Sequence, residues 1–527
     1  MLGEVWSIHL QRLSPQIIWP LVAFVGASWL MWWLWRFKFV PTLWPREPKL
    51  LPYWVPYIGA FILTGTHFGN SEPFALTIGG STTVVIRDIK DVTDMWKQTA
   101  ALSYDPFVSG VFQAFGMSRK FVKVVFRNDP GSLVRNEARM SSLLLNENPQ
   151  RKCYVHLQSD WLKTQLLSKD KLGELQGKFY DSLEEALKWE NLSLSCIVQS
   201  KTDDNSKLIS LVKFSRHTIS HCGMQTFLGK GLRKIAPSFP EDYRNYEDDS
   251  WKIFFQYPSF MARDVHAAKE RAIRGLSDYL LLPESERADL AWIFQTMSKE
   301  LRSLDLQEHD IAGIVMMILW AINNNAHVIC FWMLAHLLND APLLAEVRAQ
   351  TDQACSPDGS ISIDWLVTHC PHLDAVWFEV LRVYNATFAV RKAEGVCVIG
   401  GKTINKGDTV MGPFRQFHMN AQIFGEDARD FNPDRFLNNK QLHRTKGYAP
   451  FGGGHTYCPG RLFAQREIYM FIALTLYRFE LSVDTQADDE KRGSPGVPPV
   501  DFSHPAAGAL GPAKDVVMKL RPRCVCA

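Results

Sequence analysis

The sequence predicts an α+β fold that is mainly α-helical, with small β-sheets and one apolar helix near the amino terminus. Strand-like segments with glycine turns lie at 74–88 and 385–412, whereas most of 90–345 has apolar residues three and four positions apart. The second spacing is typical of amphipathic helices, and short runs bounded by glycine are typical of strands. We find no internal repeat, so we expect one large domain at 57–527 behind the apolar helix.

The composition excludes several classes of protein. Of the 527 residues, 46% are hydrophobic and 21% are charged, which are the proportions of a globular chain. A formal net charge of +3 without a sustained basic stripe argues against a nucleic-acid binder. The ten cysteines are scattered without CxxC pairs, which favours a reducing compartment over a disulfide framework.

The amino-terminal region predicts a membrane anchor. After a short segment at 1–16, residues 17–36 form a mostly apolar run that is long enough to cross a hydrocarbon core of about 30 Å. More basic residues follow the run than precede it, so the positive-inside rule leaves the bulk of the chain in the cytosol. A cleaved signal peptide is the alternative, but the run is long and has no A-x-A-like exit. We expect a single-pass anchor in the endoplasmic reticulum membrane.

The segment after the anchor, 37–56, is a proline-rich neck. Prolines at this density resist helix and sheet, so we expect a stiff tether. Glycosylation sequons at Asn191 and Asn385 would face the cytosol and carry no sugar.

The remaining elements follow in order along the chain. Residues 74–88 predict two strands around a Gly-Gly-Ser turn, and 171–190 and 285–305 predict amphipathic helices. Short strands return in 385–393 and 396–412. A helix is expected from about 461 to about 477.

The segment 450–460, PFGGGHTYCPG, indicates a metal-binding thiolate. Its glycines permit positive φ and a close approach of the backbone to a flat ligand. Cys458 lies just before the expected helix, where backbone N–H groups and the helix dipole lower the pKa of a thiol. A lone thiolate suits one axial bond to an iron that a porphyrin already holds, since zinc would require three more ligands.

These residues resemble the cytochrome P450 family of haem-thiolate enzymes. Phe451, Gly454, Cys458 and Gly460 spell the pattern F-x-x-G-x-x-x-C-x-G, and the resemblance extends over essentially everything from residue 50 onward. It implies the cytochrome P450 fold, haem b as cofactor and Cys458 as the ligand of its iron. It also implies that the guanidinium of Arg391, in FAVRKA, binds a haem propionate.

Two further features belong to the resemblance. Glu379 and Arg382 in EVLR, with Arg435 in FNPDRF, match a buried triad that fixes the loop under the haem. NATFAVRKAEG, FGGGHTYCPGRLFA and LWAINNN look most like the branch with sterol 7α-hydroxylases and prostacyclin synthase, including fungal relatives. Thr456 stands where many members have an arginine or histidine for a propionate, which supports that branch.

The apolar run 311–338 contains three consecutive asparagines. A second membrane span is one interpretation, but polar side chains at midspan are costly in lipid. In the family this run is the long helix on the distal face of the haem, where monooxygenases usually carry A-G-x-[DE]-T. Asn324 stands at the position of the acid and Asn325 at that of the threonine, so both are candidate catalytic residues. An amide can donate and accept hydrogen bonds but does not titrate near neutral pH.

The resemblance leaves several functions open. A monooxygenase would take electrons from NADPH-cytochrome P450 reductase, use water or a substrate hydroxyl positioned by Asn324 and Asn325 as proton relay, and hydroxylate a C–H bond. An isomerase or dehydratase would need neither O₂ nor reductase and would rearrange an oxygenated substrate. A haem sensor without turnover is a third class, but a sensor would not need a cysteinate. The anchor beside a reductase favours the monooxygenase.

The expected substrate is a lipophilic small molecule of terpenoid, steroid or alkaloid type, reached from membrane lipid. Candidate walls of its pocket are 112–116 and 497–512. An early helix in 119–128 is a candidate for further propionate contacts.

Overall fold

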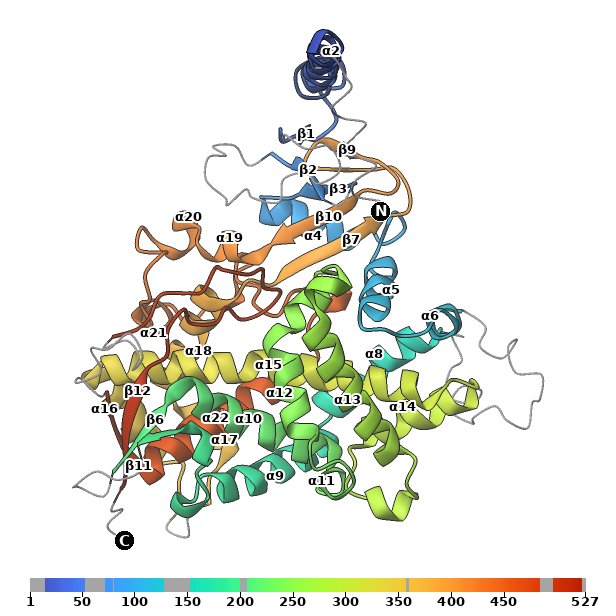
Figure 1. Cartoon of the computed structure of the whole chain (residues 1–527). Helices are drawn as coiled ribbons and strands as arrows, with labels where there is room; N and C mark the ends of the chain where they lie inside the picture. Colours follow the sequence, from blue (N-terminus) through green and yellow to red (C-terminus); the bar gives the residue numbers. More distant parts are fainter. Residues whose placement is uncertain are drawn as a thin grey trace. The chain divides into compact units, whose positions relative to one another are not determined.

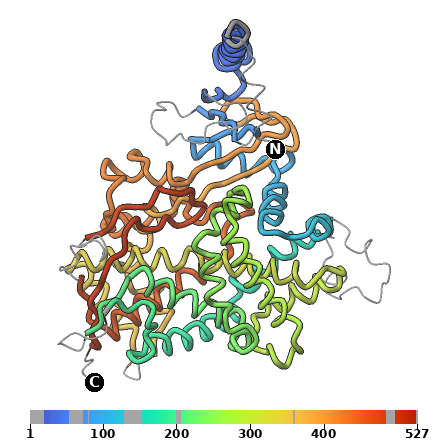
Figure 2. Tube along the Cα trace, in the orientation of Figure 1, coloured from blue at the N-terminus to red at the C-terminus, as the bar shows by residue number. Residues whose placement is uncertain are grey.

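The protein is described from a computed structural model, which covers residues 15–52, 72–78, 80–127, 152–199, 206–356, 360–483 and 496–523. The chain, traced in Figures 1 and 2, divides into two compact units. The first comprises Met1–Tyr104 and Ala389–Pro413, and the second comprises Asp105–Phe388 and Phe414–Ala527.

The first unit is built on a six-stranded sheet with the order β1-β2-β3-β10-β7-β4. The strands are β1 (Lys49–Leu50), β2 (Phe74–Ile78), β3 (Ser81–Val85), β4 (Leu102–Ser103), β7 (Phe388–Ala393) and β10 (Thr409–Pro413). β2 and β3 form an antiparallel hairpin in which Phe74 faces Val85, and β3 pairs in parallel with β10. A separate hairpin joins β8 (Cys397–Ile399) to β9 (Lys402–Ile404). The strands predicted in 74–88, 385–393 and 396–412 are therefore confirmed.

The apolar run near the amino terminus forms α2 (Pro15–Leu34). The large side chains of Trp19, Phe24 and Met31 are 72%, 71% and 68% exposed. The helix continues as a π-helical turn, η1 (Trp35–Phe39), and as α3 (Val40–Leu43). The neck was expected to resist helix and sheet, but its first half is helical, because Pro41 lies in the first turn of α3, where a missing N–H is tolerated. The neck also supplies β1, and 53–56 lie outside the described residues.

The helix α4 (Ile89–Lys97), also in the first unit, has a side-chain cap. Asp88 has extended backbone angles and its carboxylate accepts the N–H of Lys90 at 2.7 Å. A cap of this kind satisfies an N–H group that the first turn of a helix leaves without a partner.

The second unit is mainly helical. The α-helices among its described residues are α5 (Asp105–Ala114), α6 (Arg119–Val125), α8 (Tyr154–Leu167), α9 (Lys169–Ala186), α10 (Leu211–Leu228), α11 (Leu232–Ile235), α12 (Phe239–Phe254), α13 (Arg263–Leu280), α14 (Trp292–Ser303), α15 (Glu308–Asn339), α16 (Ala341–Asp352), α17 (Ile363–His369), α18 (Pro371–Tyr384), α19 (Phe414–His418), α20 (Ala421–Phe424), α21 (Asp434–Asn438) and α22 (Arg461–Arg478). A four-stranded sheet has the order β11-β12-β6-β5, with β5 (Ile197–Gln199), β6 (Lys207–Ser210), β11 (Phe479–Val483) and β12 (Val517–Pro522). The helices predicted at 171–190, 285–305 and 461–477 correspond to α9, α14 and α22.

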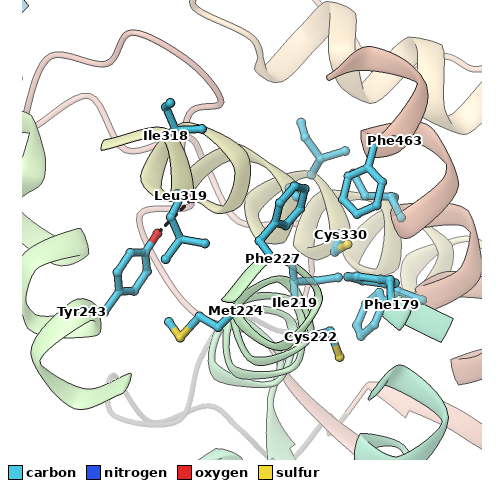
Figure 3. Packing of buried hydrophobic residues seen from close by; sticks show 14 of the residues in the cluster. Phe179, Ile219, Cys222, Met224, Phe227, Tyr243, Ile318, Leu319, Cys330 and Phe463 are labelled. Carbon is cyan, nitrogen blue, oxygen red and sulfur yellow. Dashed lines mark hydrogen bonds between the residues drawn. The ribbon is translucent and has the colours of Figure 1, made fainter. Parts of the chain in front are cut away.

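The longest helix, α15, lies in the core of the second unit. Its 32 residues and mean hydropathy of 1.6 would suit a membrane span, and it is the one helix of the described residues that passes such a test. It nevertheless packs against α10, α13 and α22, and Ile314, Leu319 and Trp332 are fully buried. Figure 3 shows Leu319 and Cys330 of α15 among apolar side chains that include Phe227 of α10 and Phe463 of α22. The prediction of a long internal helix, rather than a second membrane span, is confirmed.

Candidate active site

The loop before α22 holds Cys458 in a defined backbone conformation. Gly452 and Gly454 have φ angles of 74° and 60°, in the left-handed region that disfavours a side chain. Cys458 closes the loop, because its N–H donates to the carbonyl of Phe451 at 3.0 Å. Gly460 then leads directly into α22. The residues of the predicted F-x-x-G-x-x-x-C-x-G pattern therefore form one turn, which carries a single thiol.

Opposing effects act on the thiol of Cys458. The backbone N–H groups of Gly460 and Arg461 and the charge of Arg461 lower its pKa, as expected at the start of a helix. Burial acts more strongly in the other direction, so the net effect raises the pKa above its ordinary value. The prediction of a lowered pKa is therefore wrong, although the predicted N–H donors are present. A thiol in such a position becomes a thiolate when a metal cation replaces its proton.

Glu379, Arg382 and Arg435 form the predicted triad. Arg382 donates its Nε and Nη2 to the two carboxylate oxygens of Glu379 at 2.8 and 2.7 Å, and both side chains are fully buried. Arg435 donates its Nε to the same carboxylate at 3.1 Å. Arg382 also reaches the carbonyls of His418 and Asp430 at 2.8 and 2.9 Å. The triad thus fastens the segment that runs from α19 to α21 onto α18, which is a structural role.

Two side chains outside the cysteine loop hold its first residues. The Nε2 of His418 accepts the N–H of Ala449 at 3.1 Å, and burial lowers the pKa of this histidine to about 3, so the ring stays neutral. Asn385 donates its Nδ2 to the carbonyl of Pro450 at 2.9 Å. Its Oδ1 accepts the N–H and the hydroxyl of Thr387 at 2.8 and 2.6 Å. The sequon asparagine is therefore a buried connector, and sequence reasoning assigned no such role to it or to His418.

The three asparagines of α15 point in three directions, because consecutive helical residues are about 100° apart. Asn323 is fully buried against α10, where a Cβ on Gly223 would overlap its amide oxygen. Asn325 faces the carboxy-terminal segment and accepts the N–H of Ala509 at 2.8 Å. Asn324 lies between them, is half-buried, and forms no hydrogen bond to any residue that the structure describes.

Asn324 belongs to a face of α15 that is only partly covered. Ala321 is exposed, although it lies midway along a helix whose outer turns are buried. The partly or fully exposed residues of this face recur at helical spacing: Met317, Trp320, Ala321, Asn324, Asn325 and Val328. α15 also packs against α22, the helix that follows Cys458.

The amide of Asn323 differs from that of Asn325 in its hydrogen bonding. Neither atom of its amide meets a hydrogen-bond partner among the described residues. Burial raises the pKa of the Tyr243 hydroxyl, and the nearby amide of Asn323 lowers it by a smaller amount. The amide and the hydroxyl are close but do not form a hydrogen bond. That hydroxyl instead points toward the carbonyl of Leu319 at 3.5 Å (Figure 3).

Arg391 lies on β7, in the first unit. It is buried, its guanidinium lies over the ring of Tyr104 at 5.1 Å, and its Nη1 donates to the carbonyl of Val390 at 2.7 Å. Burial lowers its pKa below the ordinary value. Its role toward a haem propionate remains a prediction.

Both segments predicted to line a pocket contact α15. The ring of Phe115, from 112–116, lies 5.4 Å from that of Trp320 on the partly covered face. Ala509, from 497–512, binds Asn325. Phe112 instead packs inside the core, 5.7 Å from the ring of Phe121 in α6.

The residues present fit a haem held by one thiolate. The loop offers a single sulfur with N–H donors, and two of its glycines have positive φ and no side chain. Within the described part of the chain, no group of three or more His, Cys, Asp or Glu side chains is arranged to hold a metal ion. A lone sulfur suits an iron already held by a porphyrin, whereas a bare ion would require more protein ligands.

Comparison with known proteins agrees with this assignment. The model of the cytochrome P450 family matches residues 72–503. A cytochrome P450 monooxygenase of Penicillium oxalicum, poxD, is 23% identical over 474 residues, which cover 85% of this chain and 90% of poxD. Prostacyclin synthase of Rattus norvegicus is 24% identical over 520 residues, or 91% of this chain and 94% of its own. Cytochrome P450 7A1 of Oryctolagus cuniculus is 26% identical over 66% of this chain and 73% of its own.

Solved structures share the fold. The haem domain of cytochrome P450DA superposes with a TM-score of 0.59 at 17% identity, covering 86% of this chain and 90% of that domain. The chain therefore belongs to the cytochrome P450 family. It is an oxidoreductase whose cofactor is haem, and the predicted resemblance to the branch with sterol 7α-hydroxylases and prostacyclin synthase is confirmed.

Proposed function

We propose that this protein is a membrane-anchored monooxygenase that oxidises a lipophilic small molecule of terpenoid, steroid or alkaloid type in secondary metabolism. In this proposal O₂ is the oxidant, and electrons come from NADPH-cytochrome P450 reductase. The observation that carries it is the thiol of Cys458 on a glycine-rich loop with two N–H donors to the sulfur. Relatives named as monooxygenases, including poxD of Penicillium oxalicum, support the same chemistry.

Haem bound to Cys458 would supply the activation of oxygen, promoted by electron donation from the sulfur. Phe451, Gly454 and Gly460 would shape the loop beneath it, and Arg391 would bind a propionate.

Asn324 would act on the opposite side of the ligand site. Its amide has both a donor and an acceptor without a partner among the described residues, and it lies on the partly covered face of α15. Because an amide does not titrate near neutral pH, Asn324 can hold a water or a substrate hydroxyl but cannot itself release a proton. The proton would then pass through that water or hydroxyl.

The anchor would be α2. Its exposed large side chains are apolar, and lipid would cover such a surface at low free-energy cost. With basic residues after the helix, the larger part of the chain would lie on the cytosolic side of the endoplasmic reticulum membrane.

A reductase-independent isomerase or dehydratase is the second candidate. Prostacyclin synthase, a relative over nearly the whole chain, supports it. The two candidates differ in their need for electrons. Product formed without O₂, NADPH and reductase would support the isomerase, and product that requires all three would support the monooxygenase.

The experiment begins with the full chain in membranes that contain a cytochrome P450 reductase. The reduced carbon-monoxide difference spectrum is expected to have the band of a haem-thiolate, and Cys458→Ser is expected to abolish it. Cys355→Ser is the matched control, because Cys355 is also partly exposed but lies outside the loop, and it should leave the band unchanged. Metabolite profiles of a deletion strain and its parent would then supply candidate substrates for turnover with and without electrons.

A further inference from the structure

The carboxy-terminal segment Gly508–Leu510 is held from two sides. The N–H of Ala386, after α18, donates to the carbonyl of Gly508 at 2.8 Å. The N–H of Leu510 donates to the carbonyl of Tyr384 at 2.8 Å, and the indole of Trp332 on α15 donates to the carbonyl of Leu510 at 2.7 Å. The segment therefore joins α15 to the end of α18.

The middle of this segment is bound by Asn325. The N–H of Ala509 donates to the Oδ1 of Asn325 at 2.8 Å. Since an N–H group can only donate, the amide oxygen must face it, and the orientation of the amide is fixed. The Nδ2 of Asn325 makes no hydrogen bond to a described residue, so the oxygen is the atom that holds the segment.

Gly508 is the counterpart of this amide. A Cβ at position 508 would overlap the Oδ1 of Asn325 and come within 2.9 Å of its Cγ. Asn325 cannot move aside without losing the N–H of Ala509, because the same oxygen makes that bond. The amide at position 325 therefore fits only with a residue that has no side chain at position 508.

We propose that Asn325 is a positioning residue that locks the segment Gly508–Leu510 onto α15, through its amide oxygen and the bare backbone of Gly508. The effect of the lock on the reaction rests on the proposed function, because the segment then forms a wall of the ligand site. The lock itself is a property of the folded chain and is measurable without substrate.

The proposal separates the roles of the neighbouring asparagines. The amide oxygen of Asn325 binds the segment. The amide of Asn324 makes no hydrogen bond to a described residue, so it can bind a ligand. It also gives a reason for an amide at a position where the family often has threonine. A threonine hydroxyl is carried closer to the helix and tends to bond the carbonyl four residues back, so it would not reach Ala509 in the same way.

The segment also shares residues with the cysteine loop. Ala386, which binds Gly508, follows Asn385, whose Nδ2 holds the carbonyl of Pro450 at 2.9 Å. Displacing the segment is therefore expected to alter the haem spectrum as well as the stability.

The test is a double-mutant cycle on the full chain in detergent, with Asn325→Ala, Gly508→Ala and both together. Thermal midpoint and binding of imidazole, read from the shift of the Soret band, are the measurements. Gly508→Ala alone is expected to lower the midpoint and weaken imidazole binding by about tenfold, equivalent to 1.4 kcal/mol. Asn325→Ala alone is expected to lower both, because it removes the acceptor of the Ala509 N–H. The double variant is expected to lose little more than Asn325→Ala alone, because that change also removes the atoms that the new Cβ meets. Losses in the double variant equal to the sum of the two single losses would overturn the lock.

Two controls keep the outcome interpretable. Asn324→Ala, on the adjacent residue, should add its own loss to that of Gly508→Ala, and a combined loss smaller than that sum would contradict the pairing. Asn325→Asp keeps an oxygen acceptor whereas Asn325→Leu does not, so Asp should retain the midpoint and imidazole affinity that Leu loses. Equal behaviour of these two would overturn the proposal even if Gly508→Ala fails to fold. Absence of a haem-thiolate spectrum in the unmodified protein would reject the proposed function, whereas the thermal cycle would still test the lock.

Discussion

The hydroxyl of Tyr469 on α22 donates to the carboxylate of Asp374 on α18 at 2.5 Å. This bond links the helix after the cysteine loop to the helix that carries the ion triad. Both residues are largely enclosed, and burial raises the pKa of Asp374 to about 6, although the Tyr469 bond opposes part of the rise.

The raised pKa predicts a pH dependence of stability. The folded protein favours protonated Asp374, so the stabilisation is complete below about pH 4 and is lost as the pH rises through about 6. The shift corresponds to about 3 kcal/mol. Asp374→Asn can still accept the Tyr469 hydroxyl but does not titrate, so its stability relative to the unmodified protein should rise between pH 4 and 7. Denaturant unfolding at four pH values measures the difference, and a constant difference would contradict the assignment.

The triad of Glu379, Arg382 and Arg435 predicts that the stability lost on removing a charge depends on how deeply that charge is buried. Glu379→Gln leaves the fully buried Arg382 without its counter-charge and Arg435 with Asp427 alone, and it is expected to cost about 3–5 kcal/mol in the free energy of unfolding. Asp427→Asn removes an outer partner of Arg435, 3.0 Å away and 45% exposed, and should cost under about 1 kcal/mol. Thermal midpoints of the two variants provide the comparison. Similar losses in both would show that burial does not set the strength of these pairs.

The contact between α15 and α10 predicts a second pair of positions at which one substitution offsets the cost of another. Gly223→Ala would place a Cβ against the amide of Asn323 and is expected to cost about 1–3 kcal/mol through overpacking. Asn323→Ala removes a buried amide without a hydrogen-bond partner, so it should be nearly neutral alone and should restore Gly223→Ala. Unfolding midpoints of the single and double variants measure this. A large loss in Asn323→Ala alone would mean that the amide has a stabilising partner.

The assigned role of Asn324 predicts a change in catalysis without a change in cofactor binding. Asn324→Asp introduces a titratable group where family members often have an acid, so coupling of electron consumption to product should change and should acquire a pH dependence. The Soret band should stay unchanged, because Asn324 does not contact the cysteine loop through any described bond. Stopped-flow consumption of NADPH against product measures coupling. Coupling equal to that of the unmodified enzyme at every pH would remove Asn324 from the relay.

Features encoded in short stretches of sequence could be predicted. The F-x-x-G-x-x-x-C-x-G pattern specifies its own turn, and Glu379 and Arg382 are close enough in sequence to pair on one helix. Arg435 could be added only through the family resemblance. The helical extent of α15 also followed from local composition, although its position in the core did not.

Features that depend on distant partners could not be predicted. Asn325 meets Ala509 at a separation of 184 positions, and no periodicity indicates which asparagine of the three faces that segment. His418 and Asn385 gave no local sign of holding the cysteine loop. The pKa of Cys458 was mispredicted because a local argument weighs the helix start but not the extent of burial.

The pairing of Asn325 with Gly508 also bears on how this enzyme can diverge. While the amide remains on the helix, a side chain at position 508 carries a cost in stability that any benefit to substrate choice must exceed. Once the amide is lost, a side chain at 508 carries less of that cost. Mutagenesis libraries that hold residue 325 constant will therefore find fewer tolerated substitutions at position 508 than libraries that vary both residues.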